Sequence, residues 1–264
     1  MNIWLLALII LVIAAFLVMT GHGGGNFFII ALVLSGIEMH LAATSVQFIL
    51  LTSAFCAMLV FGNKKFVEWE LVVFLGILVG ISAFSGGFLS EYVPGNSLKF
   101  ILSALLFALG ILMLRPARGL SSVTSRAGLK YWNVRSFDGT ASYAINLIIV
   151  LPVVLVFGFV AGMVGISGGS FIVPLLVLIC RVPMKNAVGT ASALVAVSAL
   201  AGFTGHALAG HFDYRVAVPL AIAGAVGGLL GGSIAIKSKP GVLKILFAAS
   251  SLIAAVIMGI KSFL

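Results

Sequence analysis

Most of the chain consists of apolar runs that are long enough, or nearly so, to cross a lipid bilayer. These runs cover residues 3–19, 41–61, 71–84, 100–114, 144–163 and 245–260. About 20 consecutive apolar residues span the roughly 30 Å hydrocarbon core as a helix. Only 8% of the 264 residues are charged, whereas charged residues make up about a quarter of an ordinary soluble domain. The sequence therefore predicts an all-α polytopic membrane protein.

Charge and cysteine usage exclude several other classes of function. A net charge of +9 would suit nucleic-acid binding if the basic residues shared a soluble face, but they lie between the apolar runs. Cys56 and Cys180 lie in or beside apolar runs and lack the spacing of metal ligands. We expect no metal, no cofactor and no catalytic residues. The first run is interpreted as a retained helix, because no basic residue precedes Ile3.

The second half of the chain repeats the first half at a nearly constant offset. At an offset of 144, residues 21–27 (GHGGGNF) match residues 165–171 (GISGGSF). Pairs at an offset of 145 are Gly86 with Gly231, Gly87 with Gly232, and Lys99 with Lys244. Pairs at an offset of 146 are Thr44 with Thr190 and Pro94 with Pro240. Order and offset together indicate an internal repeat. The predicted units are a membrane repeat over 1–114, a basic linker over 115–143, and a second membrane repeat over 144–264.

Each repeat is predicted to hold four long helices and one half-helix that follows the glycine break. Residues 26–36 and 170–180 each cover about half of the hydrocarbon core at 1.5 Å per residue. Five segments per copy would leave the second copy inverted relative to the first. The predicted segments are 3–20, 26–36, 40–61, 68–89 and 97–114, then 144–163, 169–180, 185–209, 214–236 and 242–261.

The basic residues predict the orientation in the membrane, because cytoplasmic loops carry an excess of Lys and Arg. With the 115–143 linker in the cytoplasm, twelve basic residues are cytoplasmic: Lys64, Lys65, Arg115, Arg118, Arg126, Lys130, Arg135, Arg181, Lys185, Lys237, Lys239 and Lys244. Only Lys99, Arg215 and Lys261 fall outside. Both termini are therefore predicted on the outer side of a multi-pass protein of the cell (plasma or inner) membrane.

The glycine breaks form the predicted substrate site. A break inside the membrane must line protein or a wet cavity, because it frees backbone groups. The first amides of each half-helix then face an anion, which the helix dipole also attracts. The site residues are Gly23, Gly24, Gly25 and Asn26 in the first copy and Ser167, Gly168, Gly169 and Ser170 in the second. The alternative is that the glycines only let helices pack closely.

A second polar cluster follows each half-helix, with Thr44 and Ser45 in the first copy and Thr190 and Ser192 in the second. These hydroxyls can complete the shell around an oxyanion if their helices face the half-helices. The alternative is that they bond to carbonyls of their own helices.

His22 and His206 are the candidates for proton coupling, with a structural role as the alternative. Every Asp and Glu falls near the end of a predicted segment. A carboxylate relay at the midplane is therefore not predicted.

Two motifs of the second copy, GxxGGxFxVP over 165–174 and VPMKNAVGTAS over 182–192, recur in weaker form in the first copy. This pattern resembles the TauE/SafE family of membrane proteins, described as sulfite or organosulfonate exporters. The resemblance covers nearly the whole chain and is strongest from Gly162 to Asp213. The family usually has Gly-Thr-Ser where this chain has Gly189-Thr190-Ala191, and the first copy lacks a counterpart of Pro174. The resemblance implies outward secondary transport of an anion that carries sulfur or a carboxylate.

The sequence thus favours a secondary transporter, an exporter of a small anion, that works by alternating access of two inverted repeats. An anion channel with the same backbone-amide site is the alternative. A membrane-embedded enzyme is favoured least, because no acid pair or zinc motif is present. The expected partners are the anion and the lipid bilayer, without nucleic acid. Whether the protein forms a homodimer is left open.

Overall fold

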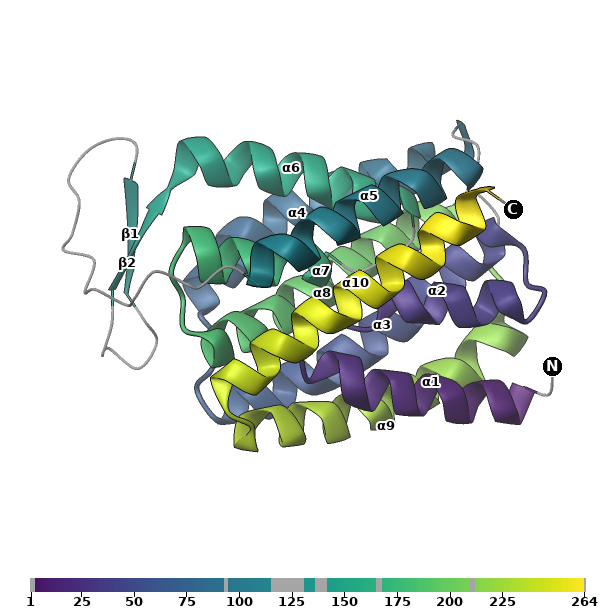
Figure 1. Cartoon of the computed structure of the whole chain (residues 1–264), viewed down its shortest axis with the longest axis horizontal. Helices are drawn as coiled ribbons and strands as arrows, with labels where there is room; N and C mark the ends of the chain where they lie inside the picture. The colour runs from purple at the N-terminus through teal and green to yellow at the C-terminus, as the bar shows by residue number, and fades with distance from the viewer. Residues whose placement is uncertain are drawn as a thin grey trace.

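The computed structural model of the chain describes residues 3–92, 95–114, 131–135, 142–164, 168–208 and 212–263. The first half contains α1 (Ile3–Val18), α2 (Gly25–Leu34), α3 (Met39–Asn63), α4 (Trp69–Leu89), the 3₁₀ turn η1 (Ser90–Tyr92) and α5 (Gly95–Leu114). Two strands follow, β1 (Tyr131–Arg135) and β2 (Ser142–Asn146). The second half contains α6 (Leu147–Val164), α7 (Gly169–Pro174), the π-helical η2 (Leu175–Ile179), α8 (Met184–Leu208), α9 (Tyr214–Lys237) and α10 (Pro240–Phe263). Figure 1 shows the helices side by side in one bundle.

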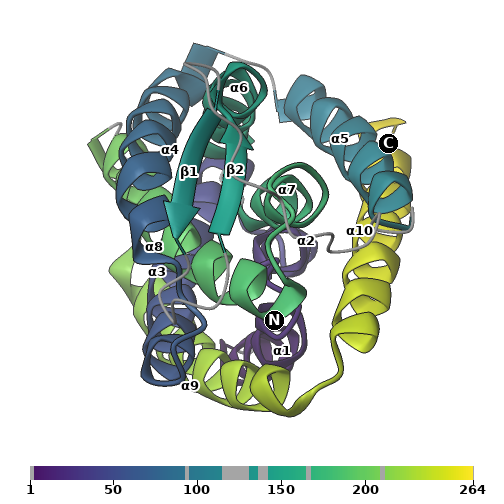
Figure 2. The same ribbon diagram turned by 90° about the vertical axis from the view of Figure 1, so that its left-hand side faces the viewer.

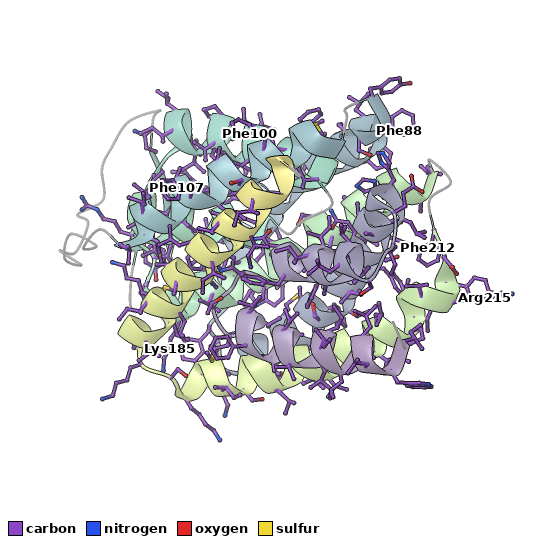
Figure 3. The ribbon with its side chains drawn as sticks, turned by 45° about the vertical axis from the view of Figure 1, so that its right-hand side comes forward. Phe88, Phe100, Phe107, Lys185, Phe212 and Arg215 are labelled. Atoms are coloured by element: carbon purple, nitrogen blue, oxygen red, sulfur yellow. The ribbon has the colours of Figure 1, made fainter. Side chains whose placement is uncertain are left out.

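The helices have the length and surface of a membrane bundle. Six helices of the described ranges are long and apolar enough to cross a membrane. Large apolar side chains cover the outside, as Phe88, Phe100 and Phe107 show in Figure 3. Polar side chains such as Asn26 and Gln47 are buried inside. The prediction of an all-α polytopic membrane protein is confirmed.

A two-stranded hairpin at one end of the bundle was not predicted. β1 and β2 pair antiparallel, with Val134 opposite Tyr143. The ring of Trp132 packs at 4.6 Å from that of Phe74 on α4. Residue 144, where the second repeat was predicted to begin, lies in β2, and α6 begins at Leu147. The rest of the predicted linker, 115–130 and 136–141, lies outside the described residues.

The packing of the helices repeats between the two halves. The counterpart helices are α1 and α6, α3 and α8, α4 and α9, and α5 and α10. The contact of α3 with α9 is matched by that of α8 with α4, and the contact of α1 with α9 by that of α6 with α4. Two further pairs join counterparts, α3 with α8 and α5 with α10. Gly86 of α4 packs on the carbonyl of Phe159 in α6, and its counterpart Gly231 of α9 packs on the carbonyl of Ala15 in α1. Each half therefore supplies the same series of one short and four longer helices, with matching contacts between the long helices.

The ends of the helices show how the two halves are joined. α5 ends and α6 begins at the end of the bundle that carries the strands, whereas α1 begins and α10 ends at the opposite end (Figure 1). Viewed from the strand-bearing end, α2 and α7 lie in the middle of the bundle, between α4 and α8 on one side and α5 and α10 on the other (Figure 2). The two short helices thus occupy the interior that the long helices enclose.

Candidate functional site

The first glycine break is a tight turn that only glycine makes readily. α1 ends at Val18, and the chain reverses through Gly21, Gly23 and Gly24 before α2 begins at Gly25. All three glycines have positive φ, at 85°, 73° and 90°. A side chain at such angles clashes with its own backbone, whereas glycine has none. The local sequence therefore fixes the point at which the half-helix begins.

The second break lies directly against the first. Of the predicted site residues, Ser167 lies outside the described residues, and α7 begins at Gly169. A Cβ at Gly169 would collide with the carbonyl oxygen of Gly21 and would lie 3.0 Å from the carbonyl carbon of His22. The absence of a side chain at Gly169 therefore allows the two breaks to touch, although equivalent positions in them are 144 residues apart in the sequence.

A hydrogen bond joins the equivalent polar residues of the two breaks. Asn26 Nδ2 donates to Ser170 Oγ at 3.0 Å, and the two side chains are 1% and 3% exposed. Within the described part of the chain, Asn26 Oδ1 has no partner. Because a carboxamide can exchange its oxygen and nitrogen by turning over, this unpaired edge can offer either a donor or an acceptor. The hydroxyl hydrogen of Ser170 is also available for an acceptor.

The helix N-termini add backbone donors to this cluster. In α2, the amides of Phe27 and Phe28 both donate to Gly24 O at 3.0 Å, and those of Phe171 and Ile172 both donate to Gly168 O. The preceding amides, those of Gly25, Asn26, Gly169 and Ser170, find no acceptor in the described ranges. Such groups carry the positive end of the helix dipole. Four N–H groups and one hydroxyl thus gather where α2 meets the helix over Gly169–Ile179.

Most hydroxyls of the second polar cluster form hydrogen bonds with other groups of the protein. Thr44 Oγ1 donates to His40 O at 3.0 Å and Ser192 Oγ donates to Val188 O at 2.9 Å, each within its own helix. Thr190 Oγ1 accepts the amide of Glu68 at 3.0 Å. Ser45 Oγ is buried and has no partner among the described groups. Of the four predicted hydroxyls, Ser45 is the one left available to a substrate.

His22 is buried and hydrogen-bonded on both ring nitrogens. Thr20 Oγ1 donates to Leu17 O, so the 3.3 Å contact with His22 Nδ1 has the ring N–H as donor. His22 Nε2 then accepts from Ser251 Oγ of α10 at 2.8 Å. The ring also packs on Phe247 with centroids 3.9 Å apart. These contacts attach the first break to α10.

His206 makes a similar pair of contacts between helices. Its Nε2 donates to the carbonyl of Gly162 in α6 at 3.0 Å, because a carbonyl only accepts. Its Nδ1 lies 3.2 Å from Ser90 Oγ, beyond the end of α4. The side chain is 1% exposed. His206 therefore links α8 to α6 and to the end of α4.

We expect His206→Ala to destabilise the protein, because it leaves the Gly162 carbonyl buried without this donor. The loss of a buried hydrogen-bond partner costs about 1–3 kcal/mol. The melting temperature in detergent should fall, while Thr204→Ala, whose hydroxyl is exposed and donates to Ala201 O in the same helix, should leave it within a degree or so. An unchanged melting temperature for His206→Ala would contradict the structural role.

Two buried polar residues were missed by the sequence analysis. Gln47 of α3 is buried, its Oε1 has no partner in the described part of the chain, and its amide lies against Gly202 of α8. Glu68 lies at the end of a segment as expected, yet its carboxylate is buried beneath β2. Only the helix packing and the hairpin bury these side chains, so a local pattern could not reveal them.

Comparison with known proteins decides the family. The sequence profile described as "Sulfite exporter TauE/SafE" matches residues 6–258. The chain belongs to the TauE/SafE family. This TauE/SafE protein is 27% identical over 220 residues to a "Probable membrane transporter protein" of Xylella fastidiosa, a match that covers 81% of this chain and 78% of the relative. No solved structure matches the chain.

A second relative is the "Probable membrane transporter protein YunE" of Bacillus subtilis. The TauE/SafE protein is 28% identical to it over 178 residues, which cover 64% of this chain and 62% of YunE. The resemblance drawn from the GxxGGxFxVP and VPMKNAVGTAS motifs is thereby confirmed. The chain therefore belongs to a family of membrane transporters.

Proposed function

We propose that this TauE/SafE protein is a secondary transporter that exports a small oxyanion, such as sulfite, a sulfonate or a carboxylate, through the junction of α2 and α7. The observation that carries the proposal is the buried Asn26–Ser170 pair, whose outer amide edge and four neighbouring backbone amides have no partner among the described residues. Donors in excess of acceptors suit an anion with several oxygen atoms. The family description supports sulfite as one such anion.

The charge of the interior supports a site that binds without fixed cations. Among the described residues, Glu68 is the only Asp, Glu, Lys or Arg whose side chain is buried. A buried Lys or Arg would bind an anion tightly and release it slowly. Neutral amides and hydroxyls give weaker binding, which allows the anion to leave on the other side of the membrane.

The two matching halves support alternating access. Each half contributes one half-helix to the site, and the counterpart helices α1 and α6 start from opposite ends of the bundle (Figure 1). Inverted repeats of this kind rock around a central site in many transporters. Lys185 and Arg215 lie at opposite ends (Figure 3). With the strand-bearing end in the cytoplasm, the termini lie on the outer side, as the positive-inside rule predicts.

Flux into proteoliposomes tests the proposal. A panel of sulfite, sulfate, small sulfonates and carboxylates should give saturable uptake and counterflow for at least one anion, whereas unitary currents would favour the channel alternative. We expect Ser170→Ala to raise the KM of that anion about tenfold, because one hydrogen bond to a charged group is lost. Ser198→Ala is the matched control, since its buried hydroxyl donates to Val195 O in its own helix. Equal KM values for the two variants would place the site elsewhere.

A further inference from the structure

Glu68 connects the two halves of the protein at the strand-bearing end. It is the residue directly before α4, and its backbone amide donates to Thr190 Oγ1 of α8 at 3.0 Å. Its Oε1 accepts from Asn186 Nδ2 of α8 at 2.8 Å and from Tyr143 of β2 at 3.5 Å. The carboxylate is 1% exposed. Glu68, Asn186 and Thr190 together are called the Glu68 latch.

Each member of the Glu68 latch has a counterpart in the other copy. Asp213 follows Glu68 by 145 residues and stands directly before α9, as Glu68 stands before α4. His40 and Thr44 precede Asn186 and Thr190 by 146 residues each. These offsets are those of the whole repeat. In the other copy, the contact equivalent to the Glu68 latch would therefore join Asp213 to His40 and Thr44.

This second contact is not formed in the structure. Asp213 Oδ1 accepts the amide of Arg215 at 2.8 Å, within the first turn of its own helix. Thr44 donates to His40 O, and no hydrogen bond from Asp213 to either residue is found among the described residues. The preceding apolar residue shows the same asymmetry, because Val67 is fully buried whereas Phe212 is 37% exposed. Among the described residues, the end near Arg215, opposite Lys185 in Figure 3, therefore lacks the counterpart of the Glu68 latch.

We propose that Glu68 and Asp213 are alternating latches of the transport cycle. Glu68 holds the strand-bearing end closed on Asn186 and Thr190, and Asp213 closes the opposite end on His40 and Thr44 when the Glu68 latch opens. The inference rests on the proposed alternating-access function and adds the contacts that exchange. His40 replaces Asn186 chemically, because an imidazole N–H donates to a carboxylate as a carboxamide N–H does.

Alternating access requires that the two latches do not open together, and the rocking of the two halves allows only one of them to close at a time. A buried carboxylate that loses its donors is costly, so each acid favours the state in which its own end is closed. If both latches closed together, the site would be sealed, and if both opened, the anion would leak. Two equivalent contacts of similar strength give two states of similar free energy, as a carrier needs.

Disulfide trapping tests this exchange in the full-length chain. Cys56 and Cys180 are the only cysteines and are first replaced by serine. Two double variants are then oxidised with copper phenanthroline. One carries Glu68→Cys with Asn186→Cys, and the other carries His40→Cys with Asp213→Cys. We expect each pair to form a disulfide that lowers flux more than about tenfold, with recovery in dithiothreitol. Asn186→Cys with Asp213→Cys is the control pair, because these positions belong to opposite ends.

A variant with all four cysteines separates this inference from the proposed function. Intact mass should show one disulfide per molecule and never both, and this readout needs no transported anion. If both disulfides form in one molecule, or if the His40–Asp213 disulfide never forms, the exchange is refuted. If no anion of the panel moves while the disulfides remain exclusive, the proposed function fails and the latches stand.

A measurement in the otherwise native chain covers the case in which the cysteine variants do not fold. Cys180 is buried and directly follows η2, in the connection before α8, and serves as the native reporter. Glu68→Gln should speed maleimide labelling of Cys180 about tenfold, and Asp213→Asn should slow it. Glu70→Gln, at an exposed position two residues away, should leave the rate unchanged. Equal labelling in all three variants would overturn the proposal.

Discussion

Asn26→Asp should reduce saturable anion flux by more than about a hundredfold. The substitution preserves the shape of the side chain and replaces its donating nitrogen with an oxygen. An aspartate that stays ionised among the amides of Gly25 and Ser170 would occupy the donors that the anion needs. Two unit charges 4 Å apart repel by about 4 kcal/mol at an effective dielectric constant near 20. Uptake of the best anion from the proteoliposome panel measures the effect.

The control for this substitution is Asn63→Asp, which adds the same charge at an exposed position at the end of α3. Its flux should stay within about twofold of the original protein, because solvent screens an exposed charge. Membrane insertion and elution in detergent should be unchanged for both variants. Normal transport by Asn26→Asp would show that the anion does not bind at this junction.

The helices could be predicted closely from the sequence because their signals are local. The predicted segment 68–89 is α4 over Trp69–Leu89, and the predicted half-helix 26–36 is α2 over Gly25–Leu34. Apolar length fixes the long helices, and positive-φ glycines fix the start of α2. The hairpin was missed because its strands depend on each other. Val134 pairs with Tyr143, and Trp132 packs on Phe74 of a distant helix.

The candidate site was predictable only as far as the repeat could reveal it. Asn26 and Ser170 occupy the same position of the two copies, and the structure joins them by a hydrogen bond. The burial of Glu68 was not predictable, because Asn186 and Tyr143 reach it from elements far along the chain. Glu68 and Asp213 are 145 residues apart, which is the offset of the repeat, so the repeat alone could have identified the two acids as equivalent positions. Repeats therefore report paired positions, whereas burial depends on packing that a single sequence does not show.

Gly169→Ala should disable transport, because it separates the two glycine breaks. A Cβ at this position would collide with the Gly21 carbonyl oxygen and lie 2.9 Å from Val195 Cγ2, so the two breaks must separate. Overpacking of this kind costs about 1–3 kcal/mol and shifts the backbone, which displaces Asn26 from Ser170. We expect saturable flux to fall more than about a hundredfold, because misplacing a binding group by about 1 Å has effects of that size.

Gly241→Ala is the matched control for Gly169→Ala, because a Cβ there meets nothing within 4 Å and the residue lies in the first turn of α10. Alanine is favoured over glycine in a helix by about 1 kcal/mol, so this variant should be at least as stable as the original protein. Proteoliposome flux and melting temperature are measured for both variants. If Gly169→Ala transports as well as Gly241→Ala, close contact of the two breaks is not required, and the anion site does not depend on their junction.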